Sequence, residues 1–302
     1  MMQEGVPRRC ASCEREHGAS ARERIESRVE ARLARLRSEG AAPSMASSSS
    51  PRPPPPATRG TGSDDRGEDP KIVWMNCDRD GSLTEAIAHA EAGPLVVHVV
   101  GTCRESVRVA RADVTIAGDA SGAVIRPPRV AGKPVGPGLF ARGAHGLALQ
   151  DLTVHEATDG IVIVGSRGVT LTRVTSKLNN GPSAYFGGFE GFGAVFDGSE
   201  AAITASNLSE NQAPMVAYRE SSVTVDATIM NDNNLDGPFS SELSSLTVRR
   251  SDMSRNAFCP QAVVDSRMVV IDSTVSCDQE SFAIKHAATA SAHSYLRAQF
   301  FR

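Results

Sequence analysis

Four ionisable side chains at nearly regular intervals are the residues of this sequence best suited to chemistry. Asp197, Arg219, Glu242 and Asp265 each stand six residues before an apolar residue of a β-like stretch. If these stretches stack as strands, equivalent side chains lie about 5 Å apart. Carboxylate oxygens are the ligands that Ca²⁺ prefers. Asp197, Glu242 and Asp265 could therefore hold Ca²⁺ as a cofactor, while Arg219 abstracts or steers a proton from a uronate.

The same column has two other interpretations. Asp197 or Asp265 could act as general acid in glycoside hydrolysis, which needs two carboxylates at a defined separation. Alternatively, the charges face water and pair along the stack, which contributes about 0–1 kcal/mol per exposed pair. We predict Asp197, Arg219 and Glu242 as the catalytic set, with Tyr218 and Asp265 as neighbouring binding residues. The histidines show no metal-ligand spacing.

Two long loops are predicted to lie at one edge of the fold. Residues 126–134 and 182–192 start ten or eleven residues after their apolar anchors, and Asp159 with Gly160 holds the same phase between them. We predict Asp159 as a binding residue at this place. The aromatic residues of the second loop alternate with glycines and suit stacking on sugar rings: Tyr185, Phe186, Phe189 and Phe192. Cations of the first loop could meet the carboxylates of an acidic glycan: Arg126, Arg129 and Lys133. The alternatives are a hydrophobic flap on the surface and a solvated, proline-rich loop.

The cysteines fall into three pairs. Cys77 and Cys103 end strands that we expect to be neighbours, so they are predicted to form a disulfide. Cys259 and Cys277 occupy adjacent coils and could either bridge or stay as buried thiols. Cys10 and Cys13 form a CxxC that suits either a metal or reactive thiols.

A repeated backbone must position these residues. Asn179, Asn211, Asn233 and Asn256 each follow an apolar anchor by eight residues, and the anchors are Leu171, Ile203, Val225 and Val248. Leu149 with Ala157, and Ile271 with Gln279, extend this frame, and from Ile116 the anchor spacings are 33, 22, 32, 22, 23 and 23. Such a period is typical of stacked coils. We therefore predict an all-β, right-handed parallel β-helix of about eight coils, in which the asparagines hydrogen-bond along their column.

Both ends of this β-helix, residues 71–302, are predicted to carry helical caps. Ser82 and Glu85 form a capping-box pattern before a short helix that should protect the first coil from edge pairing. Residues 287–299 also look helical. Residues 1–70 are expected to be disordered, with a charged helix at 21–39 and a proline-rich linker at 47–56.

The opening of the folded part carries a family resemblance. Gly81–Ile87, Gly101–Val109 and Val114–Gly118 resemble the first coil of β-helix repeat proteins of the pectate-lyase-like class. The resemblance spans about residues 72–286 and implies the fold. It implies no single activity, because that class includes lyases, hydrolases, esterases, epimerases and proteins without known catalysis. Within residues 71–302 the hydrolase patterns Asn-Thr-Asp, Asp-Asp and Gly-His-Gly do not occur.

The composition limits the classes of partner that the protein is expected to bind. A net charge of −3 argues against binding to nucleic acid or to an anionic membrane, and no apolar run is long enough for a membrane span. The first residues lack the apolar core of a secretory signal, whereas the cysteine pairs suit an exported protein, so the compartment stays open. Two functions follow as hypotheses. The protein binds an extended acidic polysaccharide between the loops, with lyase-like cleavage or epimerisation as an extension, or it is a non-catalytic scaffold whose tail tethers a protein partner.

Overall fold

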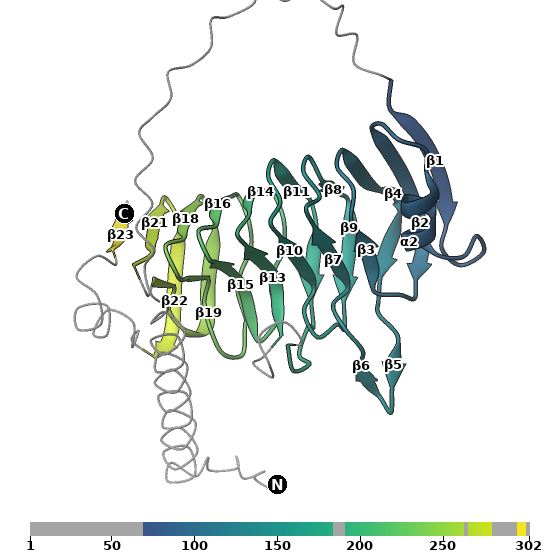
Figure 1. Ribbon diagram of the computed structural model, residues 1–302. Helices are drawn as coiled ribbons and strands as arrows, with labels where there is room; N and C mark the ends of the chain where they lie inside the picture. Colours follow the sequence, from purple (N-terminus) through teal and green to yellow (C-terminus); the bar gives the residue numbers. More distant parts are fainter. Residues whose placement is uncertain (1–68, 184–190, 263–264, 280–294, 300–302) are drawn as a thin grey trace, which may run out of the picture. The chain divides into compact units, whose positions relative to one another are not determined.

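The chain forms a parallel β-helix of about nine turns, which confirms the predicted fold class and adds about one turn to the expected number. Our computed structural model describes residues 69–183, 191–262, 265–279 and 295–299. All of them belong to Arg66–Arg302, the second of the two units into which the chain divides. The predicted tail helix, the linker, Cys10 and Cys13 lie outside the described residues. Figure 1 shows the turns stacked in chain order, from β1 at one end to β21 near the other.

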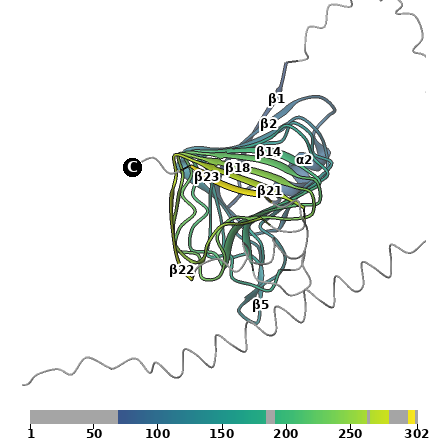
Figure 2. The same ribbon diagram turned by 90° about the vertical axis from the view of Figure 1, so that its left-hand side faces the viewer.

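One long parallel sheet runs along the whole stack and contributes one strand per turn. In spatial order its strands are β1 (Lys71–Asn76), β2 (Leu95–Cys103), β4 (Val114–Ile125), β8 (Ala148–Gln150), β11 (Val169–Thr172), β14 (Glu200–Thr204), β16 (Ser222–Asp226), β18 (Ser245–Arg249), β21 (Arg267–Ile271) and β23 (Tyr295–Gln299). We call it the first sheet. Its strands overlie one another when the stack is seen from its end (Figure 2).

Two further faces complete each turn. The second sheet contains β3 (Val107–Val109), β7 (Leu139–Arg142), β10 (Ile161–Val164), β13 (Phe192–Asp197), β15 (Ala213–Tyr218), β17 (Phe239–Ser240) and β20 (Gln261–Ala262). The third face contains β9 (Leu152–His155), β12 (Thr175–Lys177), β19 (Asp252–Phe258) and β22 (Thr274–Gln279). Isolated bridges at Asn207 and Ile229 join β12 to β19. Within a turn the chain passes from the first sheet to the third face and then to the second sheet.

The apolar anchors form one row inside the first sheet. Ile116, Leu149, Leu171, Ile203, Val225 and Val248 pair in register, and each is 0 % exposed. The last predicted anchor is wrong by one residue, because Val248 pairs with Val270 while Ile271 pairs with Arg249. Gln279 is therefore out of register with the asparagine column, because its partner in β19 is Phe258 and the partner of Asn256 is Cys277. Two adjacent apolar residues, Val270 and Ile271, made the alternation ambiguous at this point.

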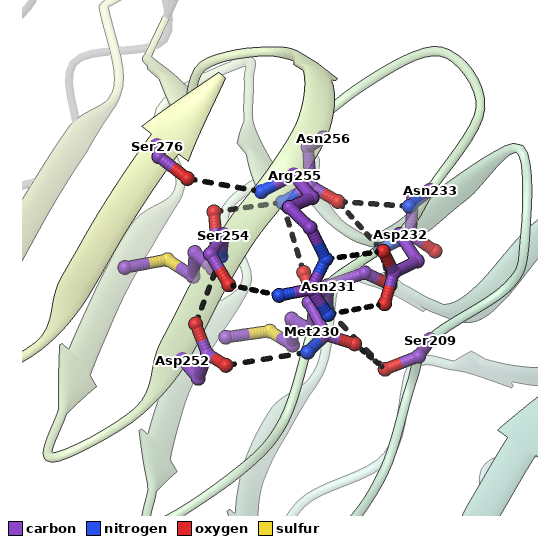
Figure 3. Close-up of polar contacts among 11 residues, drawn as sticks. Ser209, Met230, Asn231, Asp232, Asn233, Asp252, Ser254, Arg255, Asn256 and Ser276 are labelled. Carbon is purple, nitrogen blue, oxygen red and sulfur yellow. Dashed lines mark hydrogen bonds and ion pairs between the residues drawn. The ribbon is translucent and has the colours of Figure 1, made fainter. Parts of the chain in front are cut away.

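The asparagine column is confirmed. Oδ1 of Asn211 accepts hydrogen bonds from the backbone N–H (3.1 Å) and the Nδ2 (2.9 Å) of Asn179 in the preceding turn. Oδ1 of Asn256 does the same for Asn233, at 3.0 and 2.8 Å (Figure 3). These side chains therefore satisfy buried backbone donors where the chain leaves the third face.

The other two corners carry hydroxyl columns that we did not predict. At the corner before the first sheet, serine hydroxyls accept from the backbone N–H of the preceding turn, through Ser166, Ser199, Ser221 and Ser244. At the corner after the first sheet the same role falls to Ser206, Thr228, Ser251 and Ser273. Every corner of the fold is thus fastened by a polar column.

The caps differ in part from the prediction. Helix α2 (Leu83–His89) forms, and the Ser82 side chain accepts from the Glu85 N–H as a helix cap should. The Glu105 carboxylate accepts from Ser82 Oγ (2.9 Å) and from the Leu83 N–H (2.6 Å), which fixes α2 to the next turn. At the far end, Tyr295–Gln299 forms strand β23 and not a helix, because it pairs with β21. The remainder of that predicted helix lies outside the described residues.

Two disulfides are present in the described part of the chain. The Cys77–Cys103 bridge is confirmed, with Cα atoms 4.7 Å apart. Cys259 and Cys277, for which we left two states open, are also bridged, with Cα atoms 5.2 Å apart. Each bridge joins segments that the fold brings together from 26 and 18 residues apart in sequence.

Candidate functional site

Both long loops leave the same corner, between the third face and the second sheet, as predicted. The first contains an antiparallel hairpin of β5 (Arg129–Val130) and β6 (Lys133–Pro134), which projects from the body of the β-helix in Figure 1. The turn that lies between the two loops, at Thr158–Gly160, is hydrogen-bonded through its backbone to the C-terminal ends of both loops. The Thr158 N–H donates to Gly136 O at 3.1 Å, and the Gly160 N–H donates to Phe192 O at 2.7 Å. A Cβ at Gly160 would lie 2.0 Å from Ser176 Oγ, so this approach requires glycine.

Asp159 is a buried carboxylate that fastens the second loop. It is 0 % exposed, and its two oxygens accept from Ser183 Oγ at 2.8 Å and from the Phe192 N–H at 3.2 Å. Burial raises the pKa of Asp159 to about 6, against the effect of both hydrogen bonds. Asp159 therefore ties together the two ends of the loop. Its contact with a ligand stays a prediction, and the predicted aromatic residues Tyr185, Phe186 and Phe189 lie outside the described residues.

The outer face of the second sheet is apolar and closed. Phe140, Val162, Val195, Val216 and Phe239 pair in one row along the stack. Val162, Val195 and Val216 are at most 1 % exposed and form a cluster apart from the main core, together with Tyr218. The signal was present in Ile161–Val164, where apolar residues occupy both faces of the strand instead of alternating with polar ones. An open polar cleft does not lie over these valines.

The charged column is not a column in register. Asp197, at the end of β13, pairs with Val164 and with Tyr218, so it is equivalent to Tyr218 and not to Arg219. Arg219 and Glu242 lie in the bends beyond the second-sheet strands, with φ of +48° and +52°, where Gly165 and Gly198 stand in earlier turns. The turns that carry Arg219 and Glu242 have one extra residue in this bend. Asp197, Arg219 and Glu242 each stand six residues before an anchor, so the sequence spacing did not reveal the extra residue.

Asp197 and Arg219 nevertheless meet. Arg219 Nε donates to Asp197 Oδ1 at 2.6 Å and Nη2 donates to the other carboxylate oxygen, so the pair is bidentate. The Asp197 side chain is 4 % exposed and that of Arg219 is 54 % exposed. The Arg219 guanidinium also lies over the Tyr218 ring, 5.0 Å from its centroid. Three of the predicted site residues therefore touch one another, with the carboxylate beneath and the cation at the surface.

Glu242 and Asp265 do not complete a metal site with Asp197. In the described part of the chain no three carboxylate, histidine or cysteine side chains gather as metal ligands require. Glu242 is half-buried and lies close enough to help raise the pKa of Arg219, after the larger effect of Asp197. Asp265 is exposed in the bend of the next turn. Arg219 engages both oxygens of Asp197, so these two side chains form an ion pair, and a role of Glu242 and Asp265 in binding stays a prediction.

A second charged group lies at the base of the hairpin. Arg126 and Arg129 both contact one oxygen of Glu156, and His155 Nδ1 is 3.4 Å from the other oxygen. Lys177, whose carbonyl accepts from the Glu156 N–H, contributes positive charge beside His155. We call these five residues the hairpin-base cluster. It holds three permanent cations against one carboxylate, so it is a positive site beside the loop corner. Sequence analysis singled out its arginines but missed His155, Glu156 and Lys177.

The titrations of the cluster favour this charge state at neutral pH. Burial lowers the pKa of His155, and the positive charges of Arg126 and Lys177 act in the same direction, so the pKa is lowered although the Glu156 carboxylate acts to raise it. Burial opposes ionisation of Glu156, yet the arginines hold the pKa of its carboxyl below the ordinary value. His155 is therefore neutral and Glu156 is charged near pH 7.

We expect Arg219→Ala to destabilise the protein by about 1–2 kcal/mol, because it leaves a buried carboxylate without its two hydrogen bonds. Arg142→Ala is the matched control. The Arg142 guanidinium also lies over an aromatic ring, 5.6 Å from the centroid of Phe140, but Arg142 is exposed and is not paired with a carboxylate among the described residues. Urea unfolding measures both variants. An equal loss for the two would show that Asp197 does not depend on Arg219.

Comparisons with known proteins add a likeness in fold. No protein-family model matches the sequence, and no curated protein matches it. A pectin methylesterase from carrot is similar in structure, with a TM-score of 0.47 and 13 % identity, over 82 % of this chain and 91 % of that one. A pectin methylesterase mutant in complex with a hexasaccharide has a TM-score of 0.36 and 12 % identity, over 68 % and 79 % of the two chains. At these values the likeness concerns the fold alone. None of the helices in the described ranges could span a membrane.

Proposed function

We propose that the protein binds an extended acidic polysaccharide at the loop corner, through the hairpin-base cluster. The observation that carries this proposal is the excess of positive charge there, with Arg126, Arg129 and Lys177 around Glu156. Lys133 lies on the hairpin itself and is exposed. A polymer with a carboxylate on every sugar would meet several of these cations at once. Such contacts are individually weak at a surface, so a repeated ligand is the kind that profits from them.

Binding without chemistry is the better supported form of this function. Both oxygens of Asp197 are engaged by Arg219, and both oxygens of Asp159 are engaged by the second loop. A general acid or base must reach the proton that it transfers. Cleavage or epimerisation by Asp197, Arg219 and Glu242 would require the ion pair to open first. We keep that chemistry as the extension of the proposal and not as its core.

The test measures affinity for polygalacturonate, for its fully methyl-esterified form and for a neutral glucan, by calorimetry with the full chain. We expect binding to polygalacturonate alone, weakened by salt because surface charges are screened over about 8 Å at physiological ionic strength. Replacing Lys133 and Lys177 together by alanine should lower the affinity roughly five- to tenfold. Arg167→Ala removes an exposed cation at another corner and should change nothing. Equal binding to the esterified polymer would overturn the proposal.

A protein partner is the second candidate, and one observation favours it. Val130 and Val135 of the hairpin loop are 67 % and 48 % exposed, which suits contact with an apolar surface. Partner binding should then be lost in a Val130→Ser, Val135→Ser variant and survive the lysine replacements. Polysaccharide binding should show the opposite pattern.

A further inference from the structure

Strand β1 ends the first sheet and leaves one edge unpaired within the described residues. It pairs with β2 alone, and it lies at the outer end of the stack in Figure 1. Helix α2, which the sequence led us to expect as protection for the first coil, packs mainly on β2 and β3. The N–H groups of Lys71 and Cys77 donate toward the β2 side. Because successive residues of a strand alternate, Ile72, Trp74 and Asn76 direct their backbone groups to the open edge.

The open edge is short and well defined. The Asn76 N–H donates to Asp80 Oδ2 at 2.6 Å, and its carbonyl accepts from the N–H groups of Arg79 and Asp80 at 2.9 and 2.7 Å. At the other end stands Pro70, which has no N–H to donate. Only Ile72 and Trp74 are left to pair with an added strand.

The side chains of these two residues are also exposed. Ile72 is 60 % exposed and Trp74 is 69 % exposed, the highest value among the large apolar side chains of the described residues. One face of the indole stacks on His98, with ring centroids 4.3 Å apart and 18° between the planes. Trp74 of β1 is paired with His98 of β2, and β1 is the last strand of the sheet. The other face of the indole therefore points away from the end of the stack. An apolar, unpaired edge is a template for strand addition.

We propose that β1 pairs with β1 of a second copy of this chain, antiparallel and centred on Val73. A two-fold axis makes a strand antiparallel to itself and makes the interface isologous. With Val73 opposite its own equivalent, Ile72 lies opposite the second copy's Trp74, and Trp74 lies opposite the second copy's Ile72. These are the outward-directed residues, so each pair forms two backbone hydrogen bonds. The exposed indole then covers the exposed isoleucine across the junction.

The flanking residues fit the same register. Asn76 falls opposite the second copy's Pro70, so the residue whose N–H is already bonded to Asp80 meets the residue that has none. No backbone donor is therefore stranded at either end of the six-residue strand. Any other register places Ile72 or Trp74 opposite an inward-directed residue or opposite these closed ends. This self-complementarity favours a second copy over an unrelated peptide. The pairing is independent of the polysaccharide site.

The interface is small, because it rests on one short strand and two side chains, below the roughly 1,200 Å² of a standard stable complex. We expect a reversible dimer with a dissociation constant on the order of micromolar. Sedimentation velocity of the full chain over a concentration series measures it. Trp74 is the single tryptophan of the chain, so its emission should move to shorter wavelength as the dimer forms and buries it.

Replacing an exposed apolar residue by lysine tests where the dimer interface lies. Ile72→Lys places one lysine in each half of the junction and should abolish the dimer and the emission shift. Leu243→Lys is the matched control, since Leu243 is 64 % exposed on another corner, and it should leave both unchanged. A dimer that persists in Ile72→Lys would overturn the proposal. So would a chain that stays monomeric at every concentration, or a monomer whose tryptophan is already shielded by another part of the chain.

Cross-linking tests the register. In a chain with Cys10 and Cys13 replaced by serine, Val73→Cys should form an intermolecular disulfide, because directly opposite residues of this kind have Cα atoms about 4.5 Å apart. Ile72→Cys should not, because it faces the second copy's Trp74 rather than itself. Cross-linking of Ile72→Cys and not of Val73→Cys would exclude the proposed register.

Discussion

Asn211→Ala is expected to destabilise the β-helix by about 3–5 kcal/mol, the largest effect of any single change that we predict. Asn211 is 0 % exposed. Its Oδ1 accepts from the backbone N–H and the Nδ2 of Asn179, and its Nδ2 donates to the carbonyls of Ser176 (2.9 Å) and Ser209 (3.1 Å). Alanine leaves two donors and two acceptors unsatisfied inside the fold, together with a cavity. Each buried unsatisfied group costs about 1–3 kcal/mol, and entry of water reduces the sum.

Chemical denaturation followed by far-ultraviolet circular dichroism measures this loss. Asn180→Ala is the control, because Asn180 is the exposed neighbour of a column member. We expect it to change the unfolding free energy by less than about 0.5 kcal/mol. A loss below about 1 kcal/mol for Asn211→Ala would mean that water replaces the side chain in the column, and that the asparagines do not hold the turns together.

Asp159 should give the protein a pH dependence of about 3 kcal/mol between pH 4 and pH 7. Burial raises the pKa of Asp159 from an ordinary value of 3.8 to about 6, so the folded state binds this proton more tightly than the unfolded chain does. The contribution of the group to stability is therefore greatest below the unfolded pKa. It declines as pH rises between the two pKa values and stays lost above the folded one. Acidification in this window should stabilise the connection between Ser183 and Phe192.

The measurement compares wild type with Asp159→Asn by urea unfolding from pH 4 to pH 7.5. Asparagine keeps the shape and does not titrate, so relative to wild type it should gain about 3 kcal/mol as pH rises. Asp151→Asn is the control. Hydrogen bonds from Arg173 lower the pKa of the Asp151 carboxyl, so its titration falls below this window and its difference from wild type should be flat above pH 4.5. If the difference in unfolding free energy is flat with pH for Asp159→Asn as well, Asp159 has the ordinary pKa of a solvated carboxyl. That result would contradict the burial that we describe.

The sequence was sufficient for features that repeat with the period of the turn. The anchors from Ile116 to Val248, the asparagine column and the shared corner of the two loops all follow from residue type and spacing, and they are confirmed, whereas the last anchor was wrong by one residue. The Cys77–Cys103 bridge followed in the same way, because it joins the ends of the neighbouring strands β1 and β2. In a stacked fold a residue contacts its equivalent in the next turn. The period along the sequence therefore predicts which residues are neighbours in the structure.

Features that depend on one inserted residue were not accessible from spacing. The bend after β15 holds Arg219 and Glu220 where the preceding turn has Gly198 alone, and both residues have positive φ. The insertion moved Arg219 out of register with Asp197, although its long side chain still reaches the carboxylate. A bend absorbs an extra residue without a change of composition, so counting from an anchor cannot detect it.

The sequence by itself determined the fold, its period and the polar column that fastens one corner, because these follow from hydrophobic patterning and from equivalent residues stacking on one another. Only the tertiary structure decided what the candidate site is. It placed Glu156 under Arg126 and Arg129, buried Asp159 at the neck of the second loop, and closed the face over Val195. It also left Ile72 and Trp74 at an unpaired edge. Burial and side-chain partnership depend on the packing of turns and loops, and no spacing along one chain encodes them.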